Sequence, residues 1–216
     1  MVQRLLQVVE RSQGLILRTR PLTETSLIVH WLTADFGRIA TVAKGARRSN
    51  SPFRGKLDLF YLADFSFARS RRSELHTLRE VVLRETHSAL RQELAWLQQA
   101  GYCAALVEQT TETDTPLPVV YELMRGLLDH LSKQPPQPQT LFAFELQLLN
   151  ELGLKPDLAK SKLTPGAKRI VNALSASDWS AVSRLKLSDA QVTELREFLH
   201  GFLIFHLGRV PKGRTL

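Results

Sequence analysis

The chain has 216 residues and a mass of 24.4 kDa, which suits one large domain or two to three small ones. Hydrophobic residues make up 44% and charged residues 23%, so the chain can bury a hydrophobic core. Lys and Arg number 29 against 21 Asp and Glu, which gives a net charge of +8 and an isoelectric point of about 10.0.

This positive charge is unevenly distributed. Residues 1–80 contain 14 basic and 7 acidic side chains, a net charge of +7, whereas residues 81–216 contain 15 and 14, a net charge of +1. A basic N-terminal third beside a nearly neutral remainder is typical of a polyanion-binding module joined to a part with another role.

The composition also excludes several classes of protein. A single cysteine, Cys103, cannot form an internal disulfide or a cysteine-rich zinc site, and it is consistent with a cytoplasmic protein. No apolar run approaches the roughly 18 residues of a membrane span, and the first residues lack the features of a signal peptide. We therefore expect no membrane partner.

The first 83 residues show the pattern of short strands. β-Branched and aromatic residues, separated by turn-forming residues, predict strands over residues 15–17, 26–32, 38–42, 57–68 and 74–82. The alternation in the fourth strand slips near Asp64, as a β-bulge would cause. Five short strands without a helical period predict a small antiparallel barrel domain over residues 1–83.

The remaining residues, 84–216, have a helical period and predict an all-α domain, so the fold class is α+β. Ser88 is the expected N-cap of the first helix, and residues 119–131 form the second. The proline-containing segment 133–139 is a loop before a helix that begins at Thr140 and stops at Gly153. Two further helices are expected, one opened by Thr164-Pro165 and one by the capping box at Ser188, which ends at Gly208.

Motifs of catalysis are missing from the sequence. It has no dinucleotide-binding, phosphate-loop, zinc-protease or serine-hydrolase signature, and its six histidines are scattered. Asp58 and Asp64, expected on one face of one strand, are too far apart for a two-metal site. His200 and His206 point in different directions on a helix, and Cys103 lies on a packed helix face. We therefore predict neither an enzyme nor a metal site.

The sharpest signal is a basic loop after the third strand. Residues 38–56 carry six positive charges and no negative one, at Arg38, Lys44, Arg47, Arg48, Arg54 and Lys56. Gly45 and Gly55 would let the backbone approach a partner, and Phe53 would offer an aromatic face to a base. A second cluster, Arg69, Arg71 and Arg72, falls in the next hairpin. Clusters of charge are commonly only hydrated surface, but two on one small barrel favour nucleic-acid binding.

Several strings resemble the bacterial DNA repair and recombination mediator family RecO. They are residues 14–60, with VAKGARR within them, then FELQLLNELGLKPDL at 144–158 and FLHGFLIFHLGRVPKGR near the C-terminus. The resemblance implies an oligonucleotide-binding (OB) barrel followed by a helical domain, and a cytoplasmic, nucleoid-associated protein. It also implies binding of single- and double-stranded DNA, annealing of complementary strands, and help in loading RecA onto strands coated by single-stranded DNA-binding protein (SSB), with RecR as a partner.

One departure from the family concerns zinc. Many members carry a four-cysteine zinc module after the P-D-L string, whereas residues 158–175 contain no cysteine here, so we expect no zinc and no other cofactor. By resemblance, the helical domain would accept the acidic tail of SSB. A modest basic patch is the candidate for its charges, although a hydrated helix end explains the patch equally well: Lys155, Lys160, Lys162, Lys168 and Arg169.

Two alternatives remain open at this stage. An RNA-binding barrel protein would have the same composition, and competition between DNA and RNA would distinguish it. A nuclease would need carboxylates brought together from distant segments, and the basic region offers no carboxylate cluster.

Overall fold

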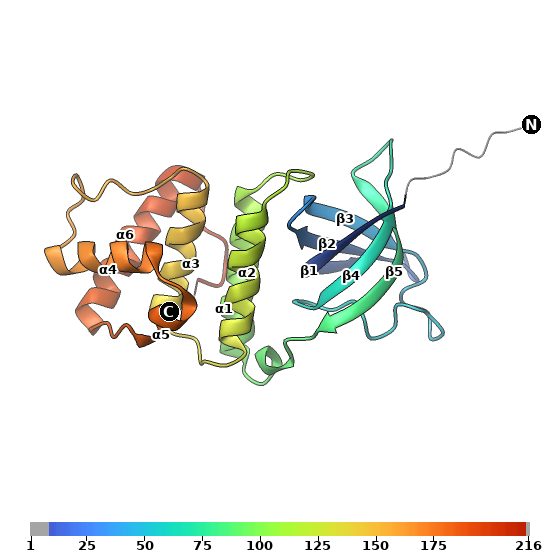
Figure 1. Ribbon diagram of the computed structural model, residues 1–216, viewed down its shortest axis with the longest axis horizontal. Coiled ribbons are helices and arrows are strands. Elements are labelled where there is room, and N and C mark those ends of the chain that lie inside the picture. The colour runs from blue at the N-terminus through green and yellow to red at the C-terminus, as the bar shows by residue number, and fades with distance from the viewer. Residues whose placement is uncertain (1–8, 215–216) are drawn as a thin grey trace, which may run out of the picture. The chain divides into compact units, whose positions relative to one another are not determined.

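The computed structural model describes residues 9–214, which divide into two units by their packing. The first contains residues 9–87 together with Glu112–Tyr121, and the second contains Ser88–Thr111 and residues 122–214. Figure 1 shows the strands gathered in the first unit and the helices that make up the second. The sequence predicts a domain boundary at residue 83, which is four residues before the end of the first segment. It also places residues 112–121 in the helical domain, whereas by their packing they belong to the first unit.

The first unit is a closed barrel of five strands in the order β1-β2-β3-β5-β4. The strands are β1 (Val9–Pro21), β2 (Leu27–Thr33), β3 (Gly37–Ala43), β4 (Leu62–Ala68) and β5 (Leu75–Glu85). All neighbours pair antiparallel except β3 and β5, which are parallel. This order and closure are those of the OB fold, so the predicted fold class is confirmed.

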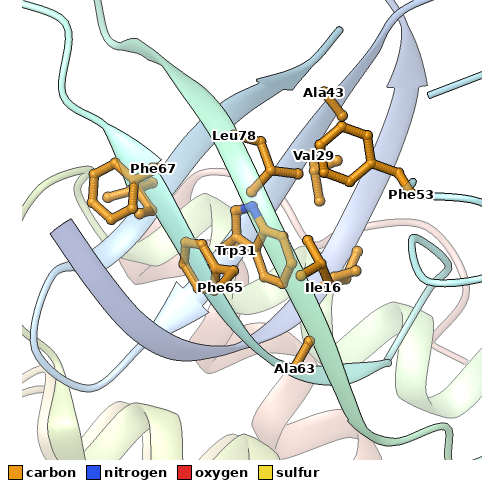
Figure 2. Close-up of a cluster of buried hydrophobic side chains, with 11 residues drawn as sticks. Ile16, Val29, Trp31, Ala43, Phe53, Ala63, Phe65, Phe67 and Leu78 are labelled. Carbon is orange, nitrogen blue, oxygen red and sulfur yellow. The ribbon is translucent and has the colours of Figure 1, made fainter. Parts of the chain in front are cut away.

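Alternate residues of these strands point into the barrel and form its core (Figure 2). Trp31 is at the centre, fully buried, with its ring stacked on Phe65 at a centroid distance of 4.1 Å. Its indole Nε1–H donates to the Thr41 hydroxyl at 2.8 Å, so the polar atom of this large side chain is satisfied inside the barrel. The core thus holds together strands far apart in sequence.

The predicted fourth strand is too long at its N-terminal end. Residues 57–61 form a turn, in which Phe60 has a φ of +64° and donates its backbone N–H to the Ile16 carbonyl at 2.7 Å. Asp58 therefore does not share a strand with Asp64, and the expectation that both lie on one strand face is wrong. The irregularity expected near Asp64 is present, because the β4–β5 register shifts on either side of it.

The segment 112–121 belongs to the barrel unit through backbone contacts. The Asp114 N–H donates to the Arg38 carbonyl at 2.9 Å, and Thr113 forms an isolated bridge with Arg38. The backbone comes so close at Gly37 that a Cβ there would lie 1.7 Å from the Thr115 oxygen. Glycine is required at this position by both that contact and its φ of +64°.

The helical unit contains one short 3₁₀ helix and most of six α-helices. They are η1 (Ser88–Arg91), α1 (Leu94–Thr110), α2 (Pro118–Leu131), α3 (Pro138–Glu151), α4 (Pro165–Ala176), α5 (Trp179–Arg184) and α6 (Asp189–Leu207). The first turn of α2 belongs to the barrel unit. A core cluster between α3, α4, α5 and α6 buries Phe142, Leu146, Val171, Leu195 and Leu199, which sit at helical spacing in the sequence.

Three predicted helix starts fit the structure and two do not. Thr164 and Ser188 accept backbone N–H groups as N-caps, Ser188 within a complete capping box, and α2 starts one residue before the predicted residue 119. Ser88 instead opens η1, and α1 begins after Glu93. Thr140 lies inside α3, whose first residue is Pro138. Proline suits the first position of a helix, because the backbone N–H of that position has no partner within the helix and proline has none.

Candidate nucleic-acid interface

The basic loop of residues 44–56 is an ordered chain of tight turns. Backbone N–H groups of Arg48, Ser51 and Arg54 donate to carbonyls three residues earlier, at 3.1–3.2 Å. Gly45 and Gly55 have φ values of +70° and +72°, which suit glycine. The loop therefore presents its side chains from a defined backbone.

Phe53 does not offer a face to a base. Its side chain is 7% exposed and belongs to the barrel core, in contact with the cluster that contains Val29 and Ala43 (Figure 2). The expectation of an exposed aromatic ring here is wrong, because burying the ring in the core of the barrel removes it from water. None of the aromatic side chains described in the barrel unit is exposed.

Two arginines of the loop also stabilise the backbone around them. The Arg47 guanidinium donates to the Thr23 carbonyl at 3.2 Å, and its backbone N–H donates to the Thr25 carbonyl at 3.0 Å. Arg54 donates to the Ser49 carbonyl at 3.2 Å. Because a guanidinium carries five N–H donors, each side chain keeps donors available for a phosphate.

Five other cations of the two clusters have no ion pair among the residues that the structure describes. Within residues 9–214, no hydrogen bond or ion pair to a side-chain nitrogen is formed by Lys44, Arg48, Lys56, Arg71 or Arg72. All but the half-buried Lys56 are exposed. Hydrated, unpaired cations lose little when a phosphate approaches, so these side chains are suited to bind one.

Arg48 lies between two hollows of the surface. One, of about 300 Å³, is lined by Arg47, Arg48 and Arg54 together with the loop backbone. The other, of about 380 Å³, is lined by Lys44 and Arg48 together with the β1–β2 turn. The structure thus brings four of the predicted residues together, whereas Arg38, Lys56, Arg71 and Arg72 do not line either hollow.

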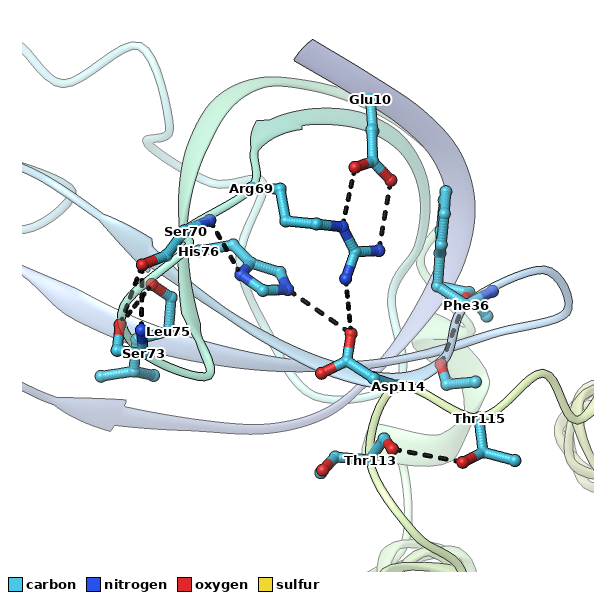
Figure 3. Close-up of polar contacts among 12 residues, drawn as sticks. Glu10, Phe36, Arg69, Ser70, Ser73, Leu75, His76, Thr113, Asp114 and Thr115 are labelled. Atoms are coloured by element: carbon cyan, nitrogen blue, oxygen red, sulfur yellow. Dashed lines mark hydrogen bonds and ion pairs between the residues drawn. The ribbon is translucent and has the colours of Figure 1, made fainter. Parts of the chain in front are cut away.

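Arg69 differs from its neighbours in the second cluster (Figure 3). Its guanidinium donates to both carboxylate oxygens of Glu10, at 2.7 and 3.2 Å, and to Asp114 at 2.8 Å. It also lies over the rings of Phe36 and Phe67, at 5.3 and 5.8 Å from their centroids. Arg69 is therefore an internal link of the barrel unit, and its charge is compensated within that unit.

Two further cations, Arg18 and Arg20, were not predicted, and they lie on one strand face with the predicted Arg38. On the outer face of the sheet, Arg18 of β1 pairs with His30 of β2, Arg20 follows two residues later, and Arg38 lies on β3. Burial, followed by these three arginines in turn, lowers the pKa of His30 to about 4. The only sequence signal was the alternation of Arg18 and Arg20, which acquires meaning when the strand register brings Arg38 to the same face.

The candidate partner patch lies on the connection between α3 and α4 and on the first turns of α4. Lys155, Lys160 and Lys162 are exposed on the connection, while Lys168 and Arg169 lie on α4. Lys160 is 3.3 Å from the Asp157 carboxylate, which partly compensates its charge.

The described residues show neither a cluster of metal ligands nor a membrane-spanning helix. In the described part of the chain, no three side chains of His, Cys, Asp or Glu are grouped as a metal ion would need. None of the described helices is long and apolar enough to span a membrane. Cys103 is fully buried, and burial, with the nearby Glu145 carboxylate, raises the pKa of its thiol.

Comparison with known proteins identifies the family. Residues 7–87 match the family model described as Recombination protein O N terminal, and residues 91–161 match Recombination protein O C terminal. DNA repair protein RecO of Anaeromyxobacter sp. (strain K) is 30% identical over 231 residues, which cover 91% of this chain and 91% of the relative. The chain belongs to the RecO family.

Two other RecO proteins show how far the similarity extends. DNA repair protein RecO of Listeria monocytogenes serotype 4b is 31% identical over 206 residues, covering 93% of this chain and 80% of the relative. The RecO protein of Bacillus pumilus is 32% identical over 148 residues, covering 68% and 57%. The chain is therefore a DNA repair protein of the RecO family whose first match coincides with the OB barrel.

Proposed function

We propose that this RecO protein binds single- and double-stranded DNA through the OB barrel and anneals complementary strands. With RecR, it would then help RecA load onto DNA coated by SSB, in the bacterial cytoplasm at the nucleoid. The observation that carries the proposal is the set of uncompensated cations around the two hollows, on a barrel whose other prominent arginine, Arg69, is bound internally.

The geometry favours contact with phosphates over stacking with aromatic rings. Since the aromatic residues of the barrel are not exposed, affinity would come from the contacts of four cations with phosphates: Lys44, Arg47, Arg48 and Arg54. Such contacts do not depend on the sequence of the bases. Annealing needs no catalytic group under this proposal. A basic surface that holds two strands side by side lowers the repulsion between their phosphates.

The test is the salt dependence of single-stranded DNA binding. Changing Lys44→Ala and Arg48→Ala together removes two phosphate contacts, so the slope of log affinity against log salt should fall by about 1.4. The matched control is Lys186→Ala with Lys212→Ala, which removes the same charge from exposed positions of the helical unit. Equal slopes for the two double variants would reject this surface, and the same pair should be compared in strand annealing.

Partner binding has its own test. A fluorescent peptide with the sequence of the SSB tail is titrated against the protein and against a variant with Lys155→Ala, Lys162→Ala and Arg169→Ala. We expect about tenfold weaker binding in the variant, because three exposed cations no longer attract the acidic peptide. The Lys186→Ala, Lys212→Ala protein is the control. Equal affinity of all three proteins would remove the patch from the proposal.

A further inference from the structure

The turn between β1 and β2 carries an exposed apolar side chain, Leu22, beside the basic loop. Leu22 is 46% exposed, although a leucine in contact with water gains nothing for the fold. The other large apolar side chains exposed on the barrel unit are Val9, Leu59, Val82 and Val119. None of these four lines either of the two hollows at Arg48.

The surroundings of Leu22 are those of a site for a nucleotide. Leu22 lines the hollow of about 380 Å³ whose charged lining residues are Lys44 and Arg48, while Glu24 of the same turn does not line it. Thr23, Thr25 and Ser26 add hydroxyl groups to the wall. An apolar side chain, two uncompensated cations and a group of hydroxyls match the base, the phosphates and the sugar of a nucleic-acid strand.

The turn is also held in place, so Leu22 is positioned before any ligand arrives. The Leu22 N–H donates to the Ser26 carbonyl at 3.0 Å, and the Thr23 hydroxyl accepts the N–H of Ser26 at 3.1 Å. Arg47 then ties the turn to the basic loop through the carbonyls of Thr23 and Thr25. A turn whose backbone is already fixed loses little conformational entropy on binding.

We propose that Leu22 packs against the face of a nucleobase of single-stranded DNA and separates it from its neighbour. The phosphates of the same strand would be held by Lys44 and Arg48. Apolar side chains are used as wedges between bases in other DNA-binding proteins, and any base has a face to offer. The proposal rests on the proposed function, and it assigns to an aliphatic residue the base contact that Phe53 cannot make.

The test uses the full chain and an oligonucleotide in which 2-aminopurine is flanked by adenines. Stacking quenches 2-aminopurine, so its fluorescence should rise when the unmodified protein binds. Leu22→Ala should bind about tenfold more weakly, lose the rise at saturation, and keep the salt slope, because the phosphate contacts remain. Leu22→Ile should keep the rise, since an aliphatic side chain of the same size also separates bases without stacking an aromatic ring on the probe.

Val82→Ala is the matched control. Val82 is 55% exposed and lines a hollow of about 480 Å³ in which Arg11 lies with the carboxylates of Asp64 and Glu80, a setting that repels phosphates. This variant should behave as the unmodified protein does.

The outcomes separate the two proposals. A rise in Leu22→Ala equal to that of the unmodified protein overturns the wedge and leaves DNA binding intact. A loss of the rise in Val82→Ala also overturns it, because the effect would then not be specific to the hollow. Absence of salt-dependent binding by the unmodified protein overturns both.

Discussion

The basic loop of the barrel and the C-terminal segment of the helical unit use arginine in opposite ways. In the loop, Arg48 is exposed and uncompensated. In the helical unit, the Arg214 side chain is 8% exposed and donates to both carboxylate oxygens of the fully buried Glu145, at 2.7 and 2.9 Å. The Tyr102 hydroxyl donates to the same carboxylate at 2.7 Å.

The difference shows what decides whether a charge serves folding or binding. A buried cation has lost its hydration and needs a fixed anion, so it contributes to the fold and is unavailable to a ligand. A hydrated cation without a fixed anion contributes little to stability and keeps its charge for a phosphate. Arg69 of the barrel is an intermediate case, because it is partly exposed but has fixed anions in Glu10 and Asp114.

The largest effect is expected at Arg214. Arg214→Ala leaves the Glu145 carboxylate buried without its cation, which should lower the free energy of unfolding of the helical unit by about 3–5 kcal/mol. Urea unfolding followed by far-UV circular dichroism measures the change. Lys212→Ala, at an exposed position two residues earlier, should change it by less than about 0.5 kcal/mol. Similar values for the two variants would contradict the contrast drawn above.

A smaller loss is expected at Arg69. Arg69→Ala removes the ion pairs with Glu10 and Asp114 and the contact with two aromatic rings, in a partly exposed setting, so the cost should be about 1–2 kcal/mol. The salt slope of DNA binding should not change. If the slope falls as it does in the Lys44→Ala, Arg48→Ala protein, Arg69 faces DNA and its role here is misassigned.

The pH dependence of stability tests the strand face around His30. Its folded pKa of about 4 lies below the usual 6.5, so the unfolded chain binds a proton first as pH falls. Stability should therefore be complete above pH 6.5 and decline between pH 6.5 and 4, by about 1–2 kcal/mol after screening by solvent. His30→Gln should flatten this decline, measured as melting temperature against pH. His130, whose pKa burial also lowers, leaves a residual slope of the same sign.

The smallest change in stability is expected at the β4–β5 hairpin. Arg71→Ala with Arg72→Ala should alter the free energy of unfolding by less than about 0.5 kcal/mol, because both side chains are exposed and uncompensated. If both contact phosphates, the salt slope should fall by about 1.4. Melting curves and a salt titration of one preparation measure the two effects. An unchanged slope would limit the interface to the basic loop.

Much of the barrel could be predicted because its signals are local. Runs of β-branched and aromatic residues located all five strands, the first predicted too short and the fourth too long, and the capping residues Thr164 and Ser188 located two helices. Phe60 could not be placed in this way, since its turn depends on a hydrogen bond to the distant Ile16 carbonyl. The six-residue helix α5 was missed because it is too short to show a period.

The candidate site was predicted by charge and corrected by packing. Lys44, Arg47, Arg48 and Arg54 are close in sequence and remain close in space. The burial of Phe53 depends on core residues such as Val29, and the ion pairing of Arg69 depends on Glu10. Both partners are tens of residues away in sequence, so no local pattern specifies these contacts. A role for Leu22 could not be predicted from the sequence, because a single leucine in a turn is common and its neighbours in the hollow are known only from the fold.

Residues 112–121 belong to the barrel unit although they follow α1 in the chain, and this affects how the barrel forms during translation. The last strand is complete at Glu85, but Arg38 and Arg69 lack their partners at Asp114 until residues that follow α1 have been made. Gly37 likewise receives its neighbour, Thr115, only then. A nascent chain halted at residue 87 would contain all five strands but not residues 112–121. The barrel unit is therefore complete only after α1 and the residues that follow it have left the ribosome. Truncation at that point should yield a weakened barrel for the same reason.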